Sequence, residues 1–63
     1  MFSIRFQYKD GHSFETVDDV RMLTLGYSVD GRLMYVLHFN DNPDENMFLD
    51  YAEFEICDIW SAN

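Results

Sequence analysis

Apolar and polar residues alternate in several short segments of the chain. In FSIRFQY, residues 2–8, the even-numbered positions are apolar and the odd-numbered ones polar. Such alternation is typical of a half-buried β-strand. Asp10-Gly11 follows, then HSFET, and an Asp-Gly pair between such segments favours a hairpin over residues 2–16.

The Asp-Gly pair allows two registers for this hairpin. A two-residue turn centred on Asp10-Gly11 sets Phe6 opposite Glu15. A three-residue turn, with Gly11 left-handed in a bulge, sets Phe6 opposite Phe14 and Arg5 opposite Glu15. We expect the second register, because it pairs an aromatic ring with an aromatic ring and a charge with its counter-charge.

A second hairpin is predicted over residues 21–39, where Asp30-Gly31 separates RMLTLGY from RLMYVLHF. With Gly31 as the left-handed bulge residue, the apolar positions separate cleanly onto two faces. One face then carries Leu23, Leu25, Tyr27, Leu33, Tyr35 and Leu37, and the other carries Met22, Thr24, Gly26, Met34, Val36 and His38. Gly26, in mid-strand, is expected to leave room for a large neighbour.

The second face of this hairpin is half apolar, and so short a chain has little left to cover it. Met22, Met34, Val36 and His38 therefore form a candidate self-association or partner surface. The alternative is that the C-terminal segment covers them. Small domains need additional burial, which favours the interface.

The remainder of the chain predicts a loop followed by two short strands. NDNPDEN, residues 40–46, consists of turn-forming and acidic residues. We expect strands at about 47–50 and 54–60, with a turn or one short helical turn near 50–53. The competing interpretation is a helix with Asn42 as N-cap and Pro43 in its first position. The predicted fold is a single, mainly β domain over residues 1–63: a small antiparallel sheet of four or five strands, largely a meander.

Charge is distributed unevenly along the sequence. Residues 1–32 hold five acids and four bases, whereas residues 33–63 hold seven acids and no Lys or Arg. The net charge of −8 argues against direct nucleic-acid binding, since phosphates are neutralised by Lys and Arg. Charge of one sign concentrated in one half indicates an interaction surface.

Size and residue types argue against an enzyme or a cofactor. A chain of 63 residues has little room for a substrate pocket. Cys57, the single cysteine, excludes an internal disulfide and is expected to be a small buried hydrophobe. We place Asp18-Asp19 in a solvated connection and His12 beside a turn. No signal-peptide or membrane-spanning run is present, so a cytoplasmic location is expected.

Residues 42–53 partly match a calcium-binding EF-hand loop. Asn42, Asp44, Asn46, Phe48 and Glu53 occupy positions 1, 3, 5, 7 and 12 of such a loop. Position 6 is Met47, where the family requires glycine, and the flanking segments predict strands rather than helices. Calcium binding is therefore a minor alternative, and no metal site is expected.

The acids and aromatic residues of the C-terminal half form the predicted partner-binding site. Carboxylates on a rigid sheet can replace phosphates on a basic partner, and exposed aromatic side chains serve as anchors. The predicted residues are Asp41, Asp44, Glu45, Phe48, Asp50, Tyr51, Glu53, Glu55, Asp58 and Trp60.

In length, acidity, single cysteine and aromatic-rich strands, the chain resembles small inhibitors encoded by phages and mobile elements. This class includes anti-CRISPR, anti-restriction and uracil-DNA glycosylase inhibitor proteins, several of which act as DNA mimics. The resemblance implies an inhibitor that docks on a basic, nucleic-acid-binding protein, and it carries over no residues. The alternative from a different class is a homodimer or larger homo-oligomer with a structural or accessory role.

Overall fold

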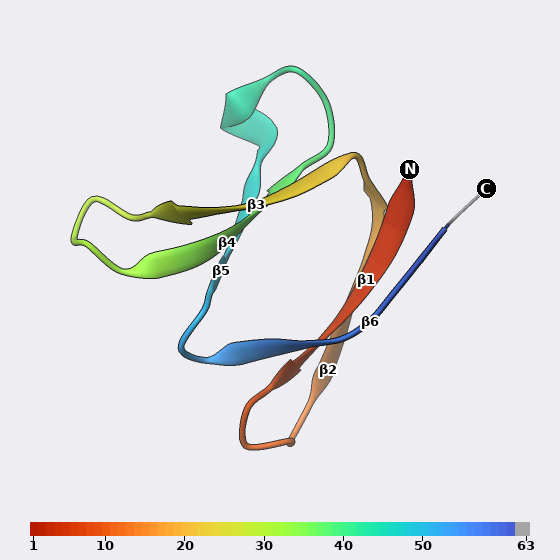
Figure 1. The fold of residues 1–63 in the computed structure, drawn as a ribbon, viewed down its shortest axis with the longest axis vertical. Helices are drawn as coiled ribbons and strands as arrows, with labels where there is room; N and C mark the ends of the chain where they lie inside the picture. The colour runs from red at the N-terminus through yellow and green to blue at the C-terminus, as the bar shows by residue number, and fades with distance from the viewer. Residues whose placement is uncertain (62–63) are drawn as a thin grey trace.

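The computed structural model describes residues 1–61, and it contains two three-stranded antiparallel sheets (Figure 1). The first sheet has the order β2-β1-β6 and the second the order β3-β4-β5. The strands are β1 (Phe2–Tyr8), β2 (Phe14–Val20), β3 (Met22–Tyr27), β4 (Leu33–His38), β5 (Met47–Asp50) and β6 (Phe54–Ser61). The one helical element in the described residues is a single 3-10 turn, η1 (Pro43–Glu45).

The prediction of a mainly β antiparallel fold is confirmed, but a single sheet of four or five strands is wrong. The described chain forms six strands in two sheets. One flat sheet would leave a whole apolar face in water. The chain instead turns a corner at Arg21, between β2 and β3, and another at residues 51–53, between β5 and β6. The inner faces of the two sheets thereby cover each other.

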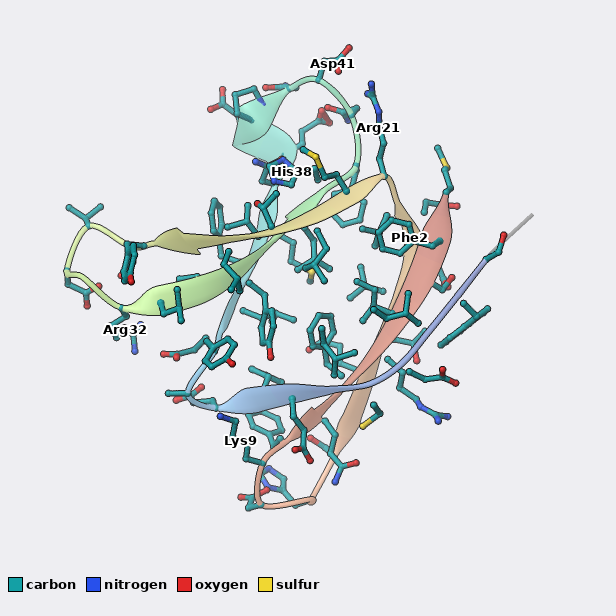
Figure 2. All side chains as sticks on the ribbon, viewed as in Figure 1. Phe2, Lys9, Arg21, Arg32, His38 and Asp41 are labelled. Carbon is teal, nitrogen blue, oxygen red and sulfur yellow. The ribbon has the colours of Figure 1, made fainter. Side chains whose placement is uncertain are left out.

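The core lies in the space that the six strands frame, and side chains fill it (Figure 2). Phe6 is fully buried at its centre, and its ring lies 5.4 Å from Tyr35 of the second sheet and 6.4 Å from Phe54 of β6, between ring centroids. Tilted and edge-on aromatic contacts at these distances are favourable. The buried core cluster consists of Ile4, Phe6, Val17, Val20, Tyr35, Leu37, Leu49 and Phe54.

The second hairpin has the predicted register. Leu23 pairs with Leu37, Thr24 with Val36 and Gly26 with Met34. Gly31 has φ of 85°, and the backbone N–H of Ser28 donates to the carbonyl of Arg32, which closes a three-residue loop. A Cβ on Gly26 would lie 3.3 Å from Val36 Cγ2, so the glycine does make room for a large neighbour.

The register predicted for the first hairpin is wrong. Phe6 lies opposite Glu15, which is the pairing of the alternative register, and Gln7 lies opposite Phe14. Gly11 is left-handed as expected, with φ of 83°, but the loop also takes in His12. The Asp10 carboxylate accepts from the backbone N–H of His12, and the His12 ring stacks on Tyr8 with 4.6 Å between centroids. These local contacts add one residue to the loop and shift the pairing by one.

Asp18 and Asp19 lie within β2 and not in a connection. The pairs Phe2–Val20 and Ile4–Val17 leave Ser3 opposite both aspartates, so β2 is bulged here. Asp19 adopts φ of 59°, and the buried Ser3 hydroxyl donates to Asp18 Oδ1 at 2.7 Å. The bulge explains why Val17 and Val20, three residues apart, both face the core.

The C-terminal strands are confirmed at Met47–Asp50 and Phe54–Ser61, with a turn between them closed by the Glu53 N–H donating to the Asp50 carbonyl. The competing helix is reduced to η1. Asn42 caps it by accepting from the Asp44 N–H, and Pro43 opens it as that interpretation required. Strand pairing with β4 takes over from Met47 onward.

Candidate protein-interaction surfaces

The ten predicted partner-binding residues do not form one surface. Asp44 and Glu45 lie in η1 and Asp41 lies just before it, at one end of the molecule, whereas β6 and its preceding turn run along the opposite side (Figure 1). Phe48 lies on β5, between these two groups in sequence. The sequence therefore identified two separate acidic regions and one aromatic side chain on a different sheet face.

The acidic loop is held by its own side chains. Asn40 Nδ2 donates to Glu45 Oε2 at 3.0 Å, and Asn40 Oδ1 accepts from the Asn42 N–H at 2.7 Å. Asp41 accepts from Arg21 Nη1 at 2.9 Å, and Figure 2 shows these two side chains next to each other beside η1. Asp44 is exposed. The loop thus presents carboxylates from an ordered backbone.

Asp50 is buried, with only 9% of its surface exposed. Its Oδ2 accepts from Arg32 Nη1 at 2.8 Å, and its Oδ1 accepts from the Ala52 N–H at 2.8 Å. Arg32 also contacts Asp30 at 3.5 Å. The Ser28 hydroxyl hydrogen-bonds Asp30 and, together with Arg32, lowers the pKa of that carboxyl. Asp50 therefore stabilises the β5–β6 turn through the Ala52 N–H and holds the Arg32 side chain in place.

Tyr51 and Trp60, two of the predicted anchors, are exposed but belong to different surroundings. The Tyr51 ring lies 5.1 Å from the Tyr35 centroid, and Lys9 Nζ lies 5.1 Å above the Tyr51 ring. Trp60 lies opposite Ser3 on the outer face of the first sheet. We call this outer face the polar face; its residues on β1 and β6 are Ser3, Arg5, Gln7, Glu55, Asp58 and Trp60.

Cys57 is exposed, so the expectation of a buried hydrophobe is wrong. The register of β1 with β6 shifts between the pairs Arg5–Asp58 and Phe6–Ile56, which leaves Cys57 as the extra residue of a bulge. Its Sγ lies 3.2 Å from Gln7 Oε1. Burial was inferred from the usual state of a free cysteine, and the inference fails here because β6 is an edge strand whose outer face is open to solvent.

The four predicted self-association residues do share one surface. Met22, Met34, Val36 and His38 all lie on the outer face of the second sheet, by their pairing in the β3–β4 hairpin. Phe48 pairs directly with Val36 and joins them. We call this surface the apolar face; it comprises Met22, Thr24, Gly26, Met34, Val36, His38 and Phe48.

Residues 47–61 of the C-terminal segment do not cover the apolar face. β5 extends the same sheet edge to edge, and β6 pairs with β1 in the other sheet. Phe48 is 56% exposed and Met22 50% exposed, whereas Val36 is only 8% exposed between its neighbours. Beside Phe48, a hollow of about 340 Å³ is lined by Tyr27, Ser28, Val29, Met34 and Phe48.

Sequence reasoning missed that Phe48 belongs to the apolar face, because it was grouped with the acids that surround it in the chain. The signal that could have found it is the alternation of MFLD, in which Phe48 and Asp50 point away from Met47 and Leu49. Pairing β5 with β4 then places Phe48 beside Val36. That pairing depends on contacts between distant parts of the chain.

The histidines make local contacts. His38 Nε2 lies 2.8 Å from Thr24 Oγ1 on the apolar face. His12 pairs with Asp10 in the exposed β1–β2 loop, and its backbone N–H, followed by its ring, lowers the pKa of the Asp10 carboxyl. Across residues 1–61, no cluster of three or more His, Cys, Asp or Glu side chains is arranged to hold a metal ion.

The span 42–53 does not fold as one EF-hand loop. It begins at η1, continues through the extended strand β5 and ends in the turn before β6. A four-residue strand is about 13 Å long, so it separates Glu53 from the oxygens of Asn42 and Asp44. Figure 1 shows η1 and the β5–β6 turn at opposite ends of β5.

Comparison of the chain with protein-family models, with curated proteins and with solved structures found no match. The described part of the chain has no helix of the length and apolarity needed to cross a membrane. Function must therefore be inferred from the two outer faces and from the charge.

Proposed function

We propose that the chain is an acidic protein-interaction module that docks on a basic, nucleic-acid-binding protein and inhibits it. The observation that carries the proposal is how the few basic side chains are used. Arg21 is paired with Asp41, Arg32 with Asp50 and Asp30, and Lys9 lies over Tyr51. These three cations are thus engaged in contacts within the chain, while the net charge remains −8.

Several carboxylates remain directed to solvent. Asp44, Glu53 and Glu55 are exposed and take part in no ion pair among the described residues. Fixed negative charges accelerate association with a basic protein and compete with phosphates for its lysines and arginines. The expected partner is a protein whose own ligand is a nucleic acid, and the expected effect is loss of that nucleic-acid binding.

The test is capture of partners from a cell extract at low salt, followed by competition. We expect the captured protein to bind duplex DNA or RNA, and the nucleic acid to displace it from the module. Raising the salt from about 50 to 300 mM should weaken the complex tenfold or more, since exposed charges are screened. A complex insensitive to salt and to nucleic acid would contradict the proposal.

Charge reversal provides the matched control. Asp44→Lys with Glu45→Lys should abolish capture, because it changes the charge of the acidic loop by four units. Asp10→Lys with Glu15→Lys makes the same change on the β1–β2 hairpin, which lies at the far end of the molecule from η1 (Figure 1). Equal loss in both variants would show that only net charge matters.

The second candidate is a homo-oligomer that buries the apolar face. It is favoured by the exposure of Met22 and Phe48 on that face. Sedimentation velocity tests it: a wild-type chain that remains monomeric at high concentration would exclude this candidate.

A further inference from the structure

We propose that the apolar face is the docking surface, and that its occupant is a partner segment carrying apolar side chains flanked by lysines or arginines. This inference rests on the proposed function and assigns to it a surface and a partner chemistry. The polar face and β6 would then contribute to the negative electrostatic field of the chain rather than to direct contact with the partner segment.

The face has the shape of a binding surface. Thr24, Val36 and Phe48 form one row across β3, β4 and β5, with Val36 as its buried floor and Phe48 standing exposed at its edge. In the next row Gly26 has no side chain, and the hollow lined by Met34 and Phe48 lies at this end of the face. A buried floor, an exposed aromatic and a neighbouring hollow suit a partner's apolar side chain.

The ends of the face carry negative charge. At one end lie Arg21, Asp41, Asp44 and Glu45, and at the other lie Arg32, Asp30 and Asp50. Figure 2 shows Arg21 and Asp41 at one end of the second sheet and Arg32 at the other. Two arginines and five carboxylates give these ends a balance of −3. An apolar centre with an acidic rim complements an apolar segment with basic flanks.

The same charges argue against a second copy as the occupant. Two apolar faces brought together would oppose −3 with −3 at the rims, and −8 with −8 overall. The rim arginines do not reduce this repulsion, because they are already paired with Asp41 and Asp50. A basic partner gains attraction at the positions where a second copy meets repulsion.

Two synthetic peptides of about ten residues test the inference at low salt, one alternating Lys with Leu and one alternating Lys with Ser. Both carry the same charge. We expect the Lys/Leu peptide to bind about tenfold more tightly, as burial of one or two apolar side chains would give. If the two peptides bind equally, the apolar face contributes nothing and the inference fails.

The methionines report the location of binding in the wild-type chain. Met22 and Met34 lie on the apolar face, whereas Met47 packs against the core on the other side of β5. We expect the Lys/Leu peptide to shift the methyl resonances of Met22 and Met34 and to leave that of Met47 in place. This readout requires no variant and so does not depend on whether a variant folds.

Phe48→Ser and Trp60→Ser separate the two faces. Both remove an exposed aromatic from an edge strand, one on the apolar face and one on the polar face. Phe48→Ser should reduce the affinity for the Lys/Leu peptide about five- to tenfold and leave that for the Lys/Ser peptide unchanged. Trp60→Ser should change neither, with circular dichroism confirming that both variants fold.

The remaining outcomes distinguish the inference from the proposed function. Loss of binding in Trp60→Ser but not in Phe48→Ser would overturn the inference and leave the acidic module in place. If neither peptide binds the wild-type chain, both fail. A dimer that forms without peptide and shifts Met22 and Met34 would identify a second copy as the occupant and overturn the inference.

Discussion

The outer faces of the two sheets differ although both sheets have three antiparallel strands. The polar face presents Arg5, Gln7 and Asp58, with the register of β1 and β6 placing Arg5 opposite Asp58. The apolar face presents Phe48, Met22 and Met34 around a buried Val36. An antiparallel sheet normally carries polar residues on the face away from the core, and the second sheet departs from this pattern at Met22, Met34, Val36 and Phe48.

This difference is not required by folding. The core is complete without the apolar face, since Val36 lies outside the buried cluster formed by the inner faces. Exposed apolar residues add to the risk of aggregation and contribute little to stability. The contrast therefore supports the proposal that the outer face of the second sheet contacts a partner, whereas the outer face of the first sheet faces water.

The largest expected effect is on the free energy of unfolding, and it distinguishes a residue of the inner faces from one of the apolar face. Phe6→Ala should destabilise the domain by about 3–5 kcal/mol, because it leaves a cavity between Tyr35 and Phe54. Phe48→Ala should cost about 1 kcal/mol or less, since that ring is 56% exposed. Urea denaturation measures both. A similar cost for the two would show that the apolar face is part of the core.

A charge placed on each outer face should give the next largest effect. Val36→Asp should cost about 2–4 kcal/mol, because it buries an unpaired carboxylate among Thr24, Gly26 and Phe48. Thr16→Asp, on exposed β2 in the first sheet, should change stability by about 0.5 kcal/mol or less. Urea midpoints at pH 7 check the pair, and equal losses would contradict the distinction between the faces.

Alkaline pH should weaken the inner face of the second sheet. Burial, with smaller contributions from Tyr51 and Glu55, raises the pKa of Tyr35 above its ordinary value of 10.0. Its contribution to stability is complete below the unfolded pKa and is lost as the pH rises through the folded one. Between pH 9 and 11, Tyr35→Phe should lose less stability than wild type, whereas Tyr27→Phe, at an exposed ring, should follow wild type.

The smallest expected effect lies at the rim of the apolar face. The Ser28 hydroxyl, then Arg32, lowers the pKa of Asp30, so its contribution is present above the unfolded pKa and is lost as the pH falls through the folded one. Asp30→Asn should slightly flatten the acid limb of a melting-temperature profile between pH 5 and 2. Asp44→Asn, whose carboxylate forms no ion pair among residues 1–61, serves as the comparison.

The two Asp-Gly hairpins show how far sequence reasoning reaches. At Asp30-Gly31 the apolar positions on both strands select one register, and that register is the observed one. At Asp10-Gly11 the choice depended on pairing Phe6 with Phe14, and the contacts of His12 with Asp10 and Tyr8 reversed it. Left-handed glycine was predictable at both turns, but the loop length was not, because it depends on side-chain contacts within the loop.

The candidate site was predictable where the residues are close in sequence and paired by a hairpin. Met22, Met34, Val36 and His38 were assigned to one face from alternation alone, and the structure places them there. Asp50 could not be placed, since its pairing with Arg32 joins segments that are distant in sequence. Cys57 was misjudged because the usual burial of a free cysteine does not apply on the exposed edge strand β6. Division into two sheets was also missed, because the corner at Arg21 carries no Gly or Pro to mark it.

The pairing of β1 with β6 has a consequence for how the domain folds. Phe2 lies opposite Ser61, so the first strand obtains one of its two neighbours only after some sixty further residues have been synthesised. Contacts between residues so distant in sequence are formed slowly, because a long loop must close first. A nascent chain that ends before residue 54 would hold β1 and β2 as a hairpin with an unpaired inner edge. The net negative charge of the nascent chain would then oppose its aggregation until β6 is synthesised and pairs with β1.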